Sequence, residues 1–347
     1  MRQASRSSRR AVVARALVAS MVVAMALAGC ATTGFDLQGH RGARGLAPEN
    51  TLPAFARALE VGVTTLELDT NVTRDGIVVI GHDTRVNPVL ARRGGAWLQG
   101  PGPAIHDLTW EELQQFDIGR IDPATAYARR YHAQVAVDGT RYARLADLFA
   151  LVRERGDTRV RFNIETKISP LAPGESLAPE PFARLLVAEI RAARMERRAT
   201  IQSFDWRTLQ VVQREAPDIE TVYLSAQQKF LDTICTGPAA GSPSIAPADC
   251  GPSPWTAGFQ LRDRGSVPRM VKAAGGATWS PEFRDVDAAR LAEAHALGLR
   301  VVVWTVDDPA QVARLLAMGV DGIISDRPDL VREEMRKRGM PLPPRGP

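Results

Sequence analysis

The chain lacks the charge pattern of a nucleic-acid-binding protein. Its formal net charge of +5 arises at the N-terminus, because residues 1–29 carry five arginines and no acidic residue. The remainder is therefore close to neutral. Aromatic residues make up only 6% of the chain, and no basic stripe has aromatic residues interleaved with it. These absences argue against a nucleic-acid partner, and the high calculated pI does not alter that conclusion.

The chain also lacks an apolar run long enough to span a bilayer comfortably. The run from Ala16 to Ala28 is short, follows the N-terminal arginines, and leads into Leu27-Ala28-Gly29-Cys30. Small residues before a cysteine resemble a bacterial lipobox, in which the cysteine is acylated. We predict a lipoprotein signal peptide over residues 1–29, lipidation of Cys30, and an anchor and linker over residues 30–34. An ordinary signal peptide with a chance cysteine is the alternative.

These N-terminal features predict a location in the cell envelope. The lipid anchor would hold the protein on a membrane, facing the periplasm or the cell exterior. Cysteine is scarce in the chain, with three residues in all. If Cys30 is lipidated, Cys235 and Cys250 remain as a pair around a loop rich in Gly, Pro, Ser and Ala. An exported protein meets oxidising conditions, so we predict a disulfide between them. Two free thiols are the alternative, and zinc is improbable because no histidine lies nearby.

Short apolar runs alternate with amphipathic segments along most of the chain. Helical spacing recurs between the runs, as in Thr51–Val61, where Asn50 is a candidate cap. Strands alternating with helices in this number predict a TIM (β/α)₈ barrel over residues 35–335. The alternative, an open doubly wound sheet, would require a glycine-rich phosphate loop after its first strand, but Gly39–Gly45 contains His and Arg. The predicted strands are Phe35–Gly39, Thr65–Asp69, Val160–Glu165, Thr200–Phe204, Thr221–Leu224, Ala277–Ser280, Val301–Thr305 and Gly322–Ser325.

Two segments depart from this alternation. Ile77–Ile80 is predicted to form a hairpin with the second strand. Residues 84–140, which include the helical pattern Thr109–Phe116, are predicted to be an insertion over the barrel mouth. Residues 336–347 are predicted to be a disordered tail, because Met340–Pro347 is rich in proline.

Acidic residues stand at the ends of two predicted strands. Glu67 and Asp69 are two residues apart, so their side chains point to the same face of the strand. Two carboxylates this close repel unless a cation or a proton lies between them. Glu165 ends the next barrel strand. Three carboxylates at adjacent strand ends suit a hard divalent cation, Ca²⁺ or Mg²⁺, whereas each acid alone would be read as a solvated strand end or an ion pair.

Two histidines also follow predicted strands. His40 follows the first strand and His82 follows the hairpin strand. Histidine titrates near neutral pH and suits proton transfer, so we predict that both are catalytic. His106, His132 and His295 lack acidic neighbours at strand ends, and we predict that they are structural.

Other residues of the predicted rim suit phosphate and an organic group. Arg41 can form bidentate hydrogen bonds with phosphate, and Lys167 adds a point charge on the same strand face as Glu165. The alternative for both is pairing with the carboxylates. Phe204 and Trp304 end later strands and are candidates for the pocket, with ordinary barrel core as the alternative.

The ordered set of motifs resembles the glycerophosphodiester phosphodiesterase family, of the exported bacterial lipoprotein type, over residues of about 35 to 332. The motifs are His40-Arg41-Gly42, Pro48-Glu49-Asn50-Thr51, Glu67-x-Asp69, Asp75-Gly76, His82-Asp83, Asn163-x-Glu165-x-Lys167, Gln202-Ser203-Phe204, Trp304-Thr305 and Ser325-Asp326-x-Pro328. The resemblance implies a TIM barrel, a divalent cation, and hydrolysis of small-molecule glycerophosphodiesters to glycerol 3-phosphate and an alcohol. Such an enzyme belongs to lipid and glycerol metabolism.

Carried over residue by residue, the resemblance also implies roles. His40 and His82 become the acid/base pair, and the reaction passes through a cyclic phosphate. Glu67, Asp69 and Glu165 become the metal ligands. Arg41 and Lys167 contact phosphate, and Phe204 and Trp304 lie against glycerol. Two other readings stay open: a barrel phosphodiesterase of the sphingomyelinase D or phosphatidylinositol phospholipase C type, and a non-catalytic surface lipoprotein.

Overall fold

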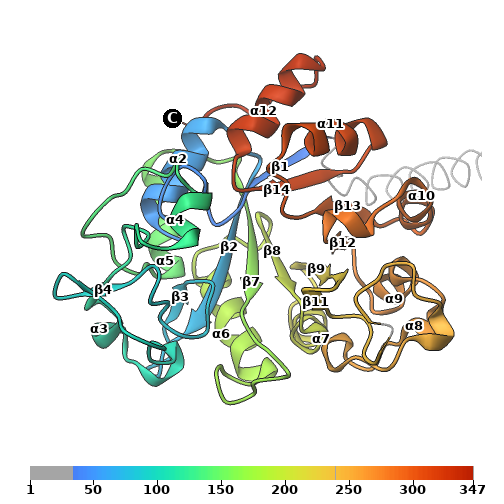
Figure 1. Ribbon diagram of the computed structural model, residues 1–347, viewed down its shortest axis with the longest axis horizontal. Coiled ribbons are helices and arrows are strands. Elements are labelled where there is room, and N and C mark those ends of the chain that lie inside the picture. Colours follow the sequence, from blue (N-terminus) through green and yellow to red (C-terminus); the bar gives the residue numbers. More distant parts are fainter. Residues whose placement is uncertain (1–33, 239, 347) are drawn as a thin grey trace, which may run out of the picture. The chain divides into compact units, whose positions relative to one another are not determined.

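The computed structural model describes residues 34–238 and 240–346 (Figure 1). The predicted signal peptide and Cys30 therefore lie outside the described residues. One compact unit spans Asp36–Pro347, and of the other, Met1–Phe35, only residues 34 and 35 are described. Among the described helices, none is both long and apolar enough to cross a membrane.

The central sheet is a closed barrel of parallel strands, as predicted. The sheet contains nine strands; β1 hydrogen-bonds to both the last and the second strand, which closes the ring, and only β3 runs antiparallel. The predicted TIM barrel is confirmed. The barrel strands are β1 (Asp36–Gly39), β2 (Thr65–Val72), β7 (Arg161–Thr166), β8 (Ala199–Ser203), β9 (Glu220–Ser225), β12 (Thr278–Pro281), β13 (Arg300–Val303) and β14 (Gly322–Ser325).

Helices surround these strands (Figure 1), and local sequence signals mark their ends. In α2 (Leu52–Val61), the Thr51 hydroxyl accepts from the N–H of Ala54, and Gly62 ends the helix in the left-handed conformation. Phe55, Ala58 and Leu59 face the barrel and are buried. The other outer helices are α5 (Leu145–Glu154), α6 (Pro179–Ala192), α7 (Trp206–Glu215), α9 (Val267–Ala273), α10 (Ala288–Ala296), α11 (Pro309–Met318) and α12 (Pro328–Lys337).

The insertion forms a small lobe beside β3 (Val78–Ile80), which pairs with β2 as a hairpin. A cluster of buried apolar side chains holds the lobe against β3, among them Val79, Val86, Leu113 and Phe116. The predicted helix over Thr109–Phe116 is shorter, because Phe116 enters a strand instead. The elements of the lobe are β4 (Arg92–Arg93), β5 (Ala96–Trp97), η1 (Ile105–Asp107), α3 (Trp110–Leu113), β6 (Phe116–Asp117) and α4 (Ala126–Arg130).

The long segment after β9 is tied by a covalent bond. Cys235 and Cys250 form a disulfide across 15 residues. In the chain-entropy model, closing a loop of this length stabilises a fold by about 3 kcal/mol. The short elements of this segment and of the loop after β12 are β10 (Gln227–Gln228), β11 (Leu231–Asp232), η2 (Pro247–Asp249), η3 (Pro254–Thr256), α8 (Leu261–Arg264) and η4 (Phe283–Asp285).

The C-terminal tail differs from the predicted disordered segment. Helix α12 continues to Lys337, and residues beyond it contact helices α2 and α12. The N–H of Gly346 donates to the carbonyl of Leu59 at 2.8 Å, and the Arg332 guanidinium donates to the carbonyl of Pro343 at 2.6 Å. These bonds use backbone groups of the tail, which side-chain composition does not reveal.

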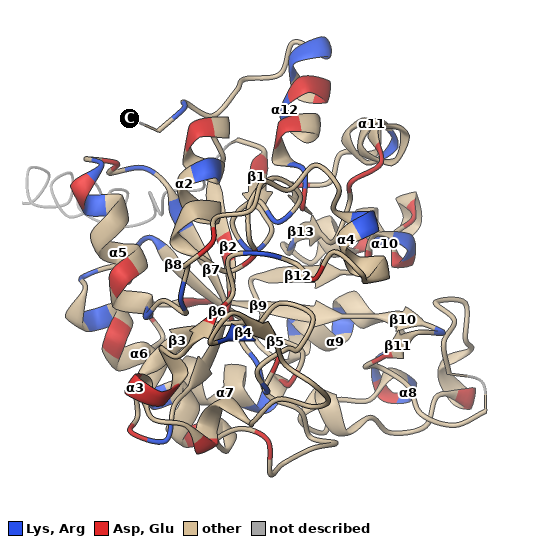
Figure 2. Cartoon of the chain, turned by 60° about the vertical axis from the view of Figure 1, so that its left-hand side comes forward, with Lys and Arg blue, Asp and Glu red and all other residues tan. Residues whose placement is uncertain are grey.

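Figure 2 shows acidic and basic residues interspersed along α5 and α12 rather than separated by sign.

Candidate active site

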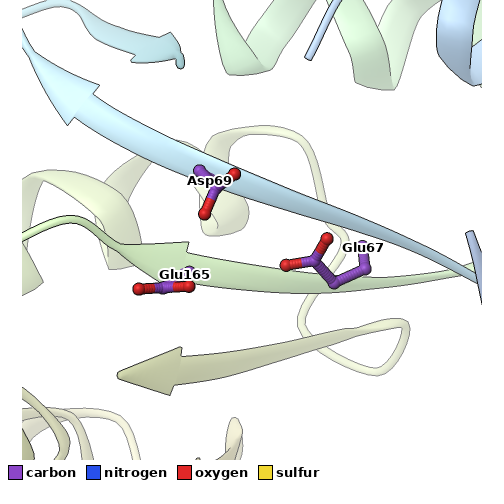
Figure 3. A group of neighbouring side chains, drawn as sticks. All are labelled: Glu67, Asp69 and Glu165. Atoms are coloured by element: carbon purple, nitrogen blue, oxygen red, sulfur yellow. The ribbon is translucent and has the colours of Figure 1, made fainter. Parts of the chain in front are cut away.

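Three carboxylates meet at the carboxyl ends of β2 and β7. Glu67 and Asp69 share one face of β2, and the register of the parallel pair sets Asp69 opposite Glu165. One oxygen from each carboxylate lies within 4.8 Å of the others, and all three residues are buried. Figure 3 shows the three side chains converging from the two adjacent strands.

Burial of the three carboxylates close together alters their pKa values. Burial, followed by the charges of Asp69 and Glu165, raises the pKa of Glu67 well above its usual range. Burial also raises the pKa of Glu165 to about 7, against the opposing effect of Lys167. Burial acts on Asp69 in the same direction, but the positive charges of His82, Arg41 and Lys167 outweigh it and hold the pKa below its usual range. An oxygen-rich, acidic and buried donor set of this kind fits a hard divalent cation.

Hydrogen bonds fix the orientation of these carboxylates. Glu67 accepts from the backbone N–H of Arg41 at 2.8 Å and from Gln202 Nε2 at 2.7 Å. Asn50 Nδ2 donates to Asp69 at 2.8 Å. Gln202 is held in turn by Asn163, whose Nδ2 donates to its Oε1 at 2.8 Å inside the barrel. These supporting bonds leave the facing carboxylate oxygens directed at one another.

His40 follows β1 and is held by Asp326, which follows the last strand, β14. Its Nδ1 lies 2.6 Å from Asp326 Oδ1, and Arg44 holds that same carboxylate through two bonds of 2.8 and 2.9 Å. The other ring nitrogen, Nε2, lies 3.9 Å from Glu67. Burial, followed by the charge of Arg44, lowers the pKa of His40 to about 4. Because the Asp326 pKa lies well below its usual range, we assign the proton to Nδ1, which leaves Nε2 free toward the cluster.

His82 follows β3 and is oriented in the same way as His40. Its Nδ1 lies 2.9 Å from Asp83 Oδ1, and Asn87 Nδ2 donates to the other oxygen of Asp83 at 2.7 Å. Burial, followed by the charges of Arg41 and Lys167, lowers the pKa of His82. Asn71 Nδ2 supports the loop by donating to the carbonyl of Gly81 at 2.7 Å. Each imidazole is thus oriented by an aspartate on Nδ1.

Two cationic side chains lie beside the carboxylates. Arg41 Nη1 donates to Glu49, and Arg41 Nε lies 3.3 Å from Asp69. That Nε is buried and makes no hydrogen bond to any described residue, so a donor remains available. Lys167 Nζ donates to Glu165 at 2.7 Å and lies 3.7 Å from Asp69. Both side chains thus pair with carboxylates, which is the alternative considered from the sequence, and the phosphate contacts stay a prediction.

The cluster opens into a cavity of about 210 Å³. Part of its wall is aromatic: Phe204 and Trp304 stand edge to face with ring centroids 5.3 Å apart, and Lys167 Nζ lies over the Phe204 ring. The ring centroid of Trp255, which follows the disulfide in the sequence, lies 6.5 Å from that of Phe204. All the predicted catalytic, substrate-binding and metal-binding residues line this one cavity: His40, Arg41, Glu67, Asp69, His82, Glu165, Lys167, Phe204 and Trp304.

The sequence reading overlooked most of the groups that hold these residues. Arg44 is in none of the motifs, and Asp326 and Glu49 occur in motifs without a predicted role. Tyr127 and Tyr131 of the insertion also contact the site, as described below. Asp326 follows the strand that neighbours β1, so the barrel order offered a signal for it. His295 does not line this cavity; its Nε2 lies 2.9 Å from Asp321, an acidic neighbour just before β14 that was not expected from the sequence.

Comparisons with known proteins agree on one family. The sequence model of the glycerophosphoryl diester phosphodiesterase family matches residues 40–330. A glycerophosphodiester phosphodiesterase from Caldanaerobacter subterraneus subsp. tengcongensis is 27% identical over 302 residues, covering 86% of this chain and 97% of that protein. A solved structure from Silicibacter pomeroyi named for the same family is 34% identical with a TM-score of 0.76, covering 88% of this chain and 95% of that chain.

A further structure shows the same fold at lower identity. A phosphodiesterase from Oleispira antarctica, solved in complex with the product sn-glycerol-3-phosphate, is 20% identical with a TM-score of 0.60. The match covers 86% of this chain and 96% of that chain.

Proposed function

Because the chain belongs to the glycerophosphoryl diester phosphodiesterase family, and is thus a phosphoric diester hydrolase, we propose that it hydrolyses glycerophosphodiesters by histidine acid/base catalysis with a bound divalent cation. The products are glycerol 3-phosphate and an alcohol. The observation that carries this proposal is one cavity that contains a buried carboxylate triad together with two histidines, each paired with an aspartate.

Glu67, Asp69 and Glu165 hold the cation, for which Ca²⁺ and Mg²⁺ are the candidates. The raised pKa values of Glu67 and Glu165 support this assignment, because burial first and neighbouring carboxylates second disfavour the charged forms, and a cation would offset both effects. When bound, the cation neutralises charge on the phosphoryl oxygens. Gln202 and the backbone N–H of Arg41 keep Glu67 in place for that purpose.

The histidines move the protons of the reaction. One imidazole takes the proton from the free hydroxyl of the substrate's glycerol, whose oxygen then attacks phosphorus. The other ring must be protonated on both nitrogens, as an imidazolium, when the anionic substrate is bound; it gives its Nε2 proton to the departing alcohol oxygen as the bond of that oxygen to phosphorus breaks. The resulting cyclic phosphate is opened by water, with the same two groups exchanging roles. Asp326 and Asp83 hold the rings so that Nε2 is the nitrogen that exchanges protons.

The remaining residues bind the two ends of the substrate. Arg41 and Lys167 contact the phosphoryl oxygens, and the free Nε donor of Arg41 supports that role. Phe204 and Trp304 lie against the carbon atoms of glycerol, as their edge-to-face wall beside Lys167 suggests. The cavity thus separates an ionic half, where the diester is cleaved, from an aromatic half.

Release of glycerol 3-phosphate from a panel of glycerophosphodiesters tests this function. The panel should be run with chelator, and after restoring Ca²⁺ or Mg²⁺. We expect cation-dependent release that is lost in His40→Ala and His82→Ala. Headgroup release from intact lipid vesicles, without glycerol 3-phosphate from the panel, would instead favour a sphingomyelinase D or phosphatidylinositol phospholipase C type of activity. No release in either assay would leave the non-catalytic reading.

We also propose that the protein is held in the cell envelope by lipid on Cys30. The lipobox-like sequence ending at Cys30 supports this proposal. The active site would then face the periplasm or the cell exterior. Detergent-phase partitioning of the mature protein, compared with Cys30→Ser, tests the anchor.

A further inference from the structure

One segment of the insertion binds the loop that carries the catalytic groups. Residues 127–135 contact the loop between β1 and α2 through both backbone and side chains. The N–H of Val135 donates to the carbonyl of Leu46 at 3.0 Å, and Gln134 Nε2 donates to the carbonyl of Arg44 at 2.7 Å. These bonds fix the position of the insertion relative to the loop.

Two tyrosines of this segment reach further, to the acids behind the catalytic groups. The Tyr131 hydroxyl donates to Asp326 Oδ2 at 3.1 Å, and Asp326 is the partner of His40. The Tyr127 hydroxyl donates to Glu49 Oε2, and Glu49 is the partner of Arg41. Each tyrosine therefore contacts the carboxylate that orients one of two adjacent residues, the histidine and the arginine.

The tyrosines form a rigid unit with Arg44. Their rings meet edge to face with centroids 4.7 Å apart, and the Arg44 guanidinium lies over the Tyr131 ring at 4.9 Å. Arg44 Nη1 also donates to the Tyr127 hydroxyl at 3.1 Å. Asp326 thus accepts from Arg44, His40 and Tyr131, which leaves its carboxylate little freedom to rotate.

The loop itself needs such support. Arg41 and Asn50 have positive φ values of 49° and 55°, which side-chain-bearing residues rarely adopt. Gly42 has φ of 83°, and a Cβ there would lie 2.7 Å from the backbone of Ala54. Residues in such conformations persist only where surrounding contacts hold them. The insertion supplies several of those contacts.

We propose that Tyr127 and Tyr131 are positioning residues, through which the insertion holds Arg41 and His40 in their reactive orientations. This inference rests on the proposed function, in which His40 transfers protons and Arg41 binds phosphate. Tyr131 acts on the chemical step through Asp326. Tyr127 acts on phosphate binding through Glu49. The insertion thereby completes the site without contributing a catalytic residue of its own.

The tests are Tyr131→Phe and Tyr127→Phe, which remove the hydroxyls and keep the ring packing. Loss of a bond that orients a catalytic or binding group typically costs roughly 10–100-fold. We expect Tyr131→Phe to lower kcat by about tenfold or more with little change in KM. We expect Tyr127→Phe to raise KM and to weaken binding of glycerol 3-phosphate by a similar factor, with a smaller effect on kcat.

The coupling through Glu49 has its own test. In a Glu49→Gln background, Tyr127→Phe should raise KM by much less than in the wild type, because the acceptor it serves has already lost its charge. Equal effects of Tyr127→Phe in both backgrounds would overturn the proposed route from Tyr127 to Arg41.

Tyr223→Phe is the matched control for losing a buried tyrosine hydroxyl. Tyr223 donates to the carbonyl of Ala274 at 2.8 Å, away from the cavity. The Tyr223→Phe substitution should lower thermal stability and leave kcat and KM unchanged. If the insertion variants behave like this control, they are merely structural and the inference is wrong. If the wild type releases no glycerol 3-phosphate, the proposed function fails instead; calorimetric binding of glycerol 3-phosphate to Tyr127→Phe then decides the inference, and unchanged affinity overturns it.

Discussion

Replacing Glu165 by glutamine should stabilise the metal-free protein and weaken its response to a divalent cation. Glu165 is buried, and its pKa is raised to about 7 from an ordinary 4.5. In the unfolded chain it ionises near 4.5, whereas in the folded protein it holds its proton up to about 7. The folded state is therefore favoured below pH 4.5, and that advantage is lost as pH rises through 7.

The size of the effect follows from this difference. A pKa shift of one unit corresponds to 1.36 kcal/mol, so the ionised Glu165 costs the metal-free fold about 3 kcal/mol at pH 8. Glutamine removes the charge and keeps the shape and an oxygen that accepts from Lys167. We expect Glu165→Gln to raise the free energy of unfolding at pH 8 by up to about 3 kcal/mol, or the melting temperature by several degrees. The difference from wild type should disappear near pH 4.

Urea or thermal unfolding in EDTA measures this difference in the free energy of unfolding. The measurement is then repeated with Ca²⁺ or Mg²⁺ added. Excess cation at about 100 times its Kd should stabilise the wild type by about 2.7 kcal/mol, and the variant by much less. Glu60→Gln is a control, because Glu60 is exposed and pairs with Arg57 at 3.0 Å; such surface pairs contribute about 0–1 kcal/mol. A metal-free Glu165→Gln protein less stable than wild type at pH 8 would refute the reasoning, and so would an equal cation response in both.

Three further outcomes are expected. Chelation should abolish hydrolysis, and Glu67→Ala or Asp69→Ala should do the same without unfolding the barrel; full activity after exhaustive dialysis against EDTA would contradict this. His40→Ala and His82→Ala should each lower kcat by roughly 10²–10⁴, whereas His295→Ala should leave kcat nearly unchanged, and equal losses at all three positions would indicate instability. Cys30 should carry lipid in protein isolated from the envelope, which mass spectrometry of its peptides checks. Reduction of the Cys235–Cys250 disulfide should lower thermal stability with a smaller effect on kcat than loss of either histidine, which thermal unfolding and kinetics with and without reductant measure.

Much of the fold and the cavity lining could be predicted because the relevant patterns are local. Apolar runs mark the strands, and a period of two places Glu67 and Asp69 on one face. Parallel strands bring their carboxyl ends together, so Glu165 follows from the strand order. Helix α12 buries Pro328, Val331 and Met335 at helical spacing and extends to Lys337, beyond the predicted end of the barrel at residue 335.

The residues that orient the site could not be found in this way. Helix α4 has no buried residue, so nothing in its apolar pattern marks Tyr127 as a contact of Glu49. The tail beyond α12 contacts helices α2 and α12 through its backbone groups, which composition does not reveal. Such contacts depend on how distant segments pack, and a single sequence has no periodicity that reports them.

The closure of the barrel has a consequence for how the protein becomes active during its synthesis. His40 and Asp326 are 286 residues apart and meet only because β14 pairs with β1. Nearly the whole chain must therefore emerge before the histidine acquires its partner. Chains cut short before β14 should lack this pairing however well their earlier strands associate. On the proposed mechanism, chains that lack β14 should therefore cleave diesters less efficiently than chains in which His40 has its partner.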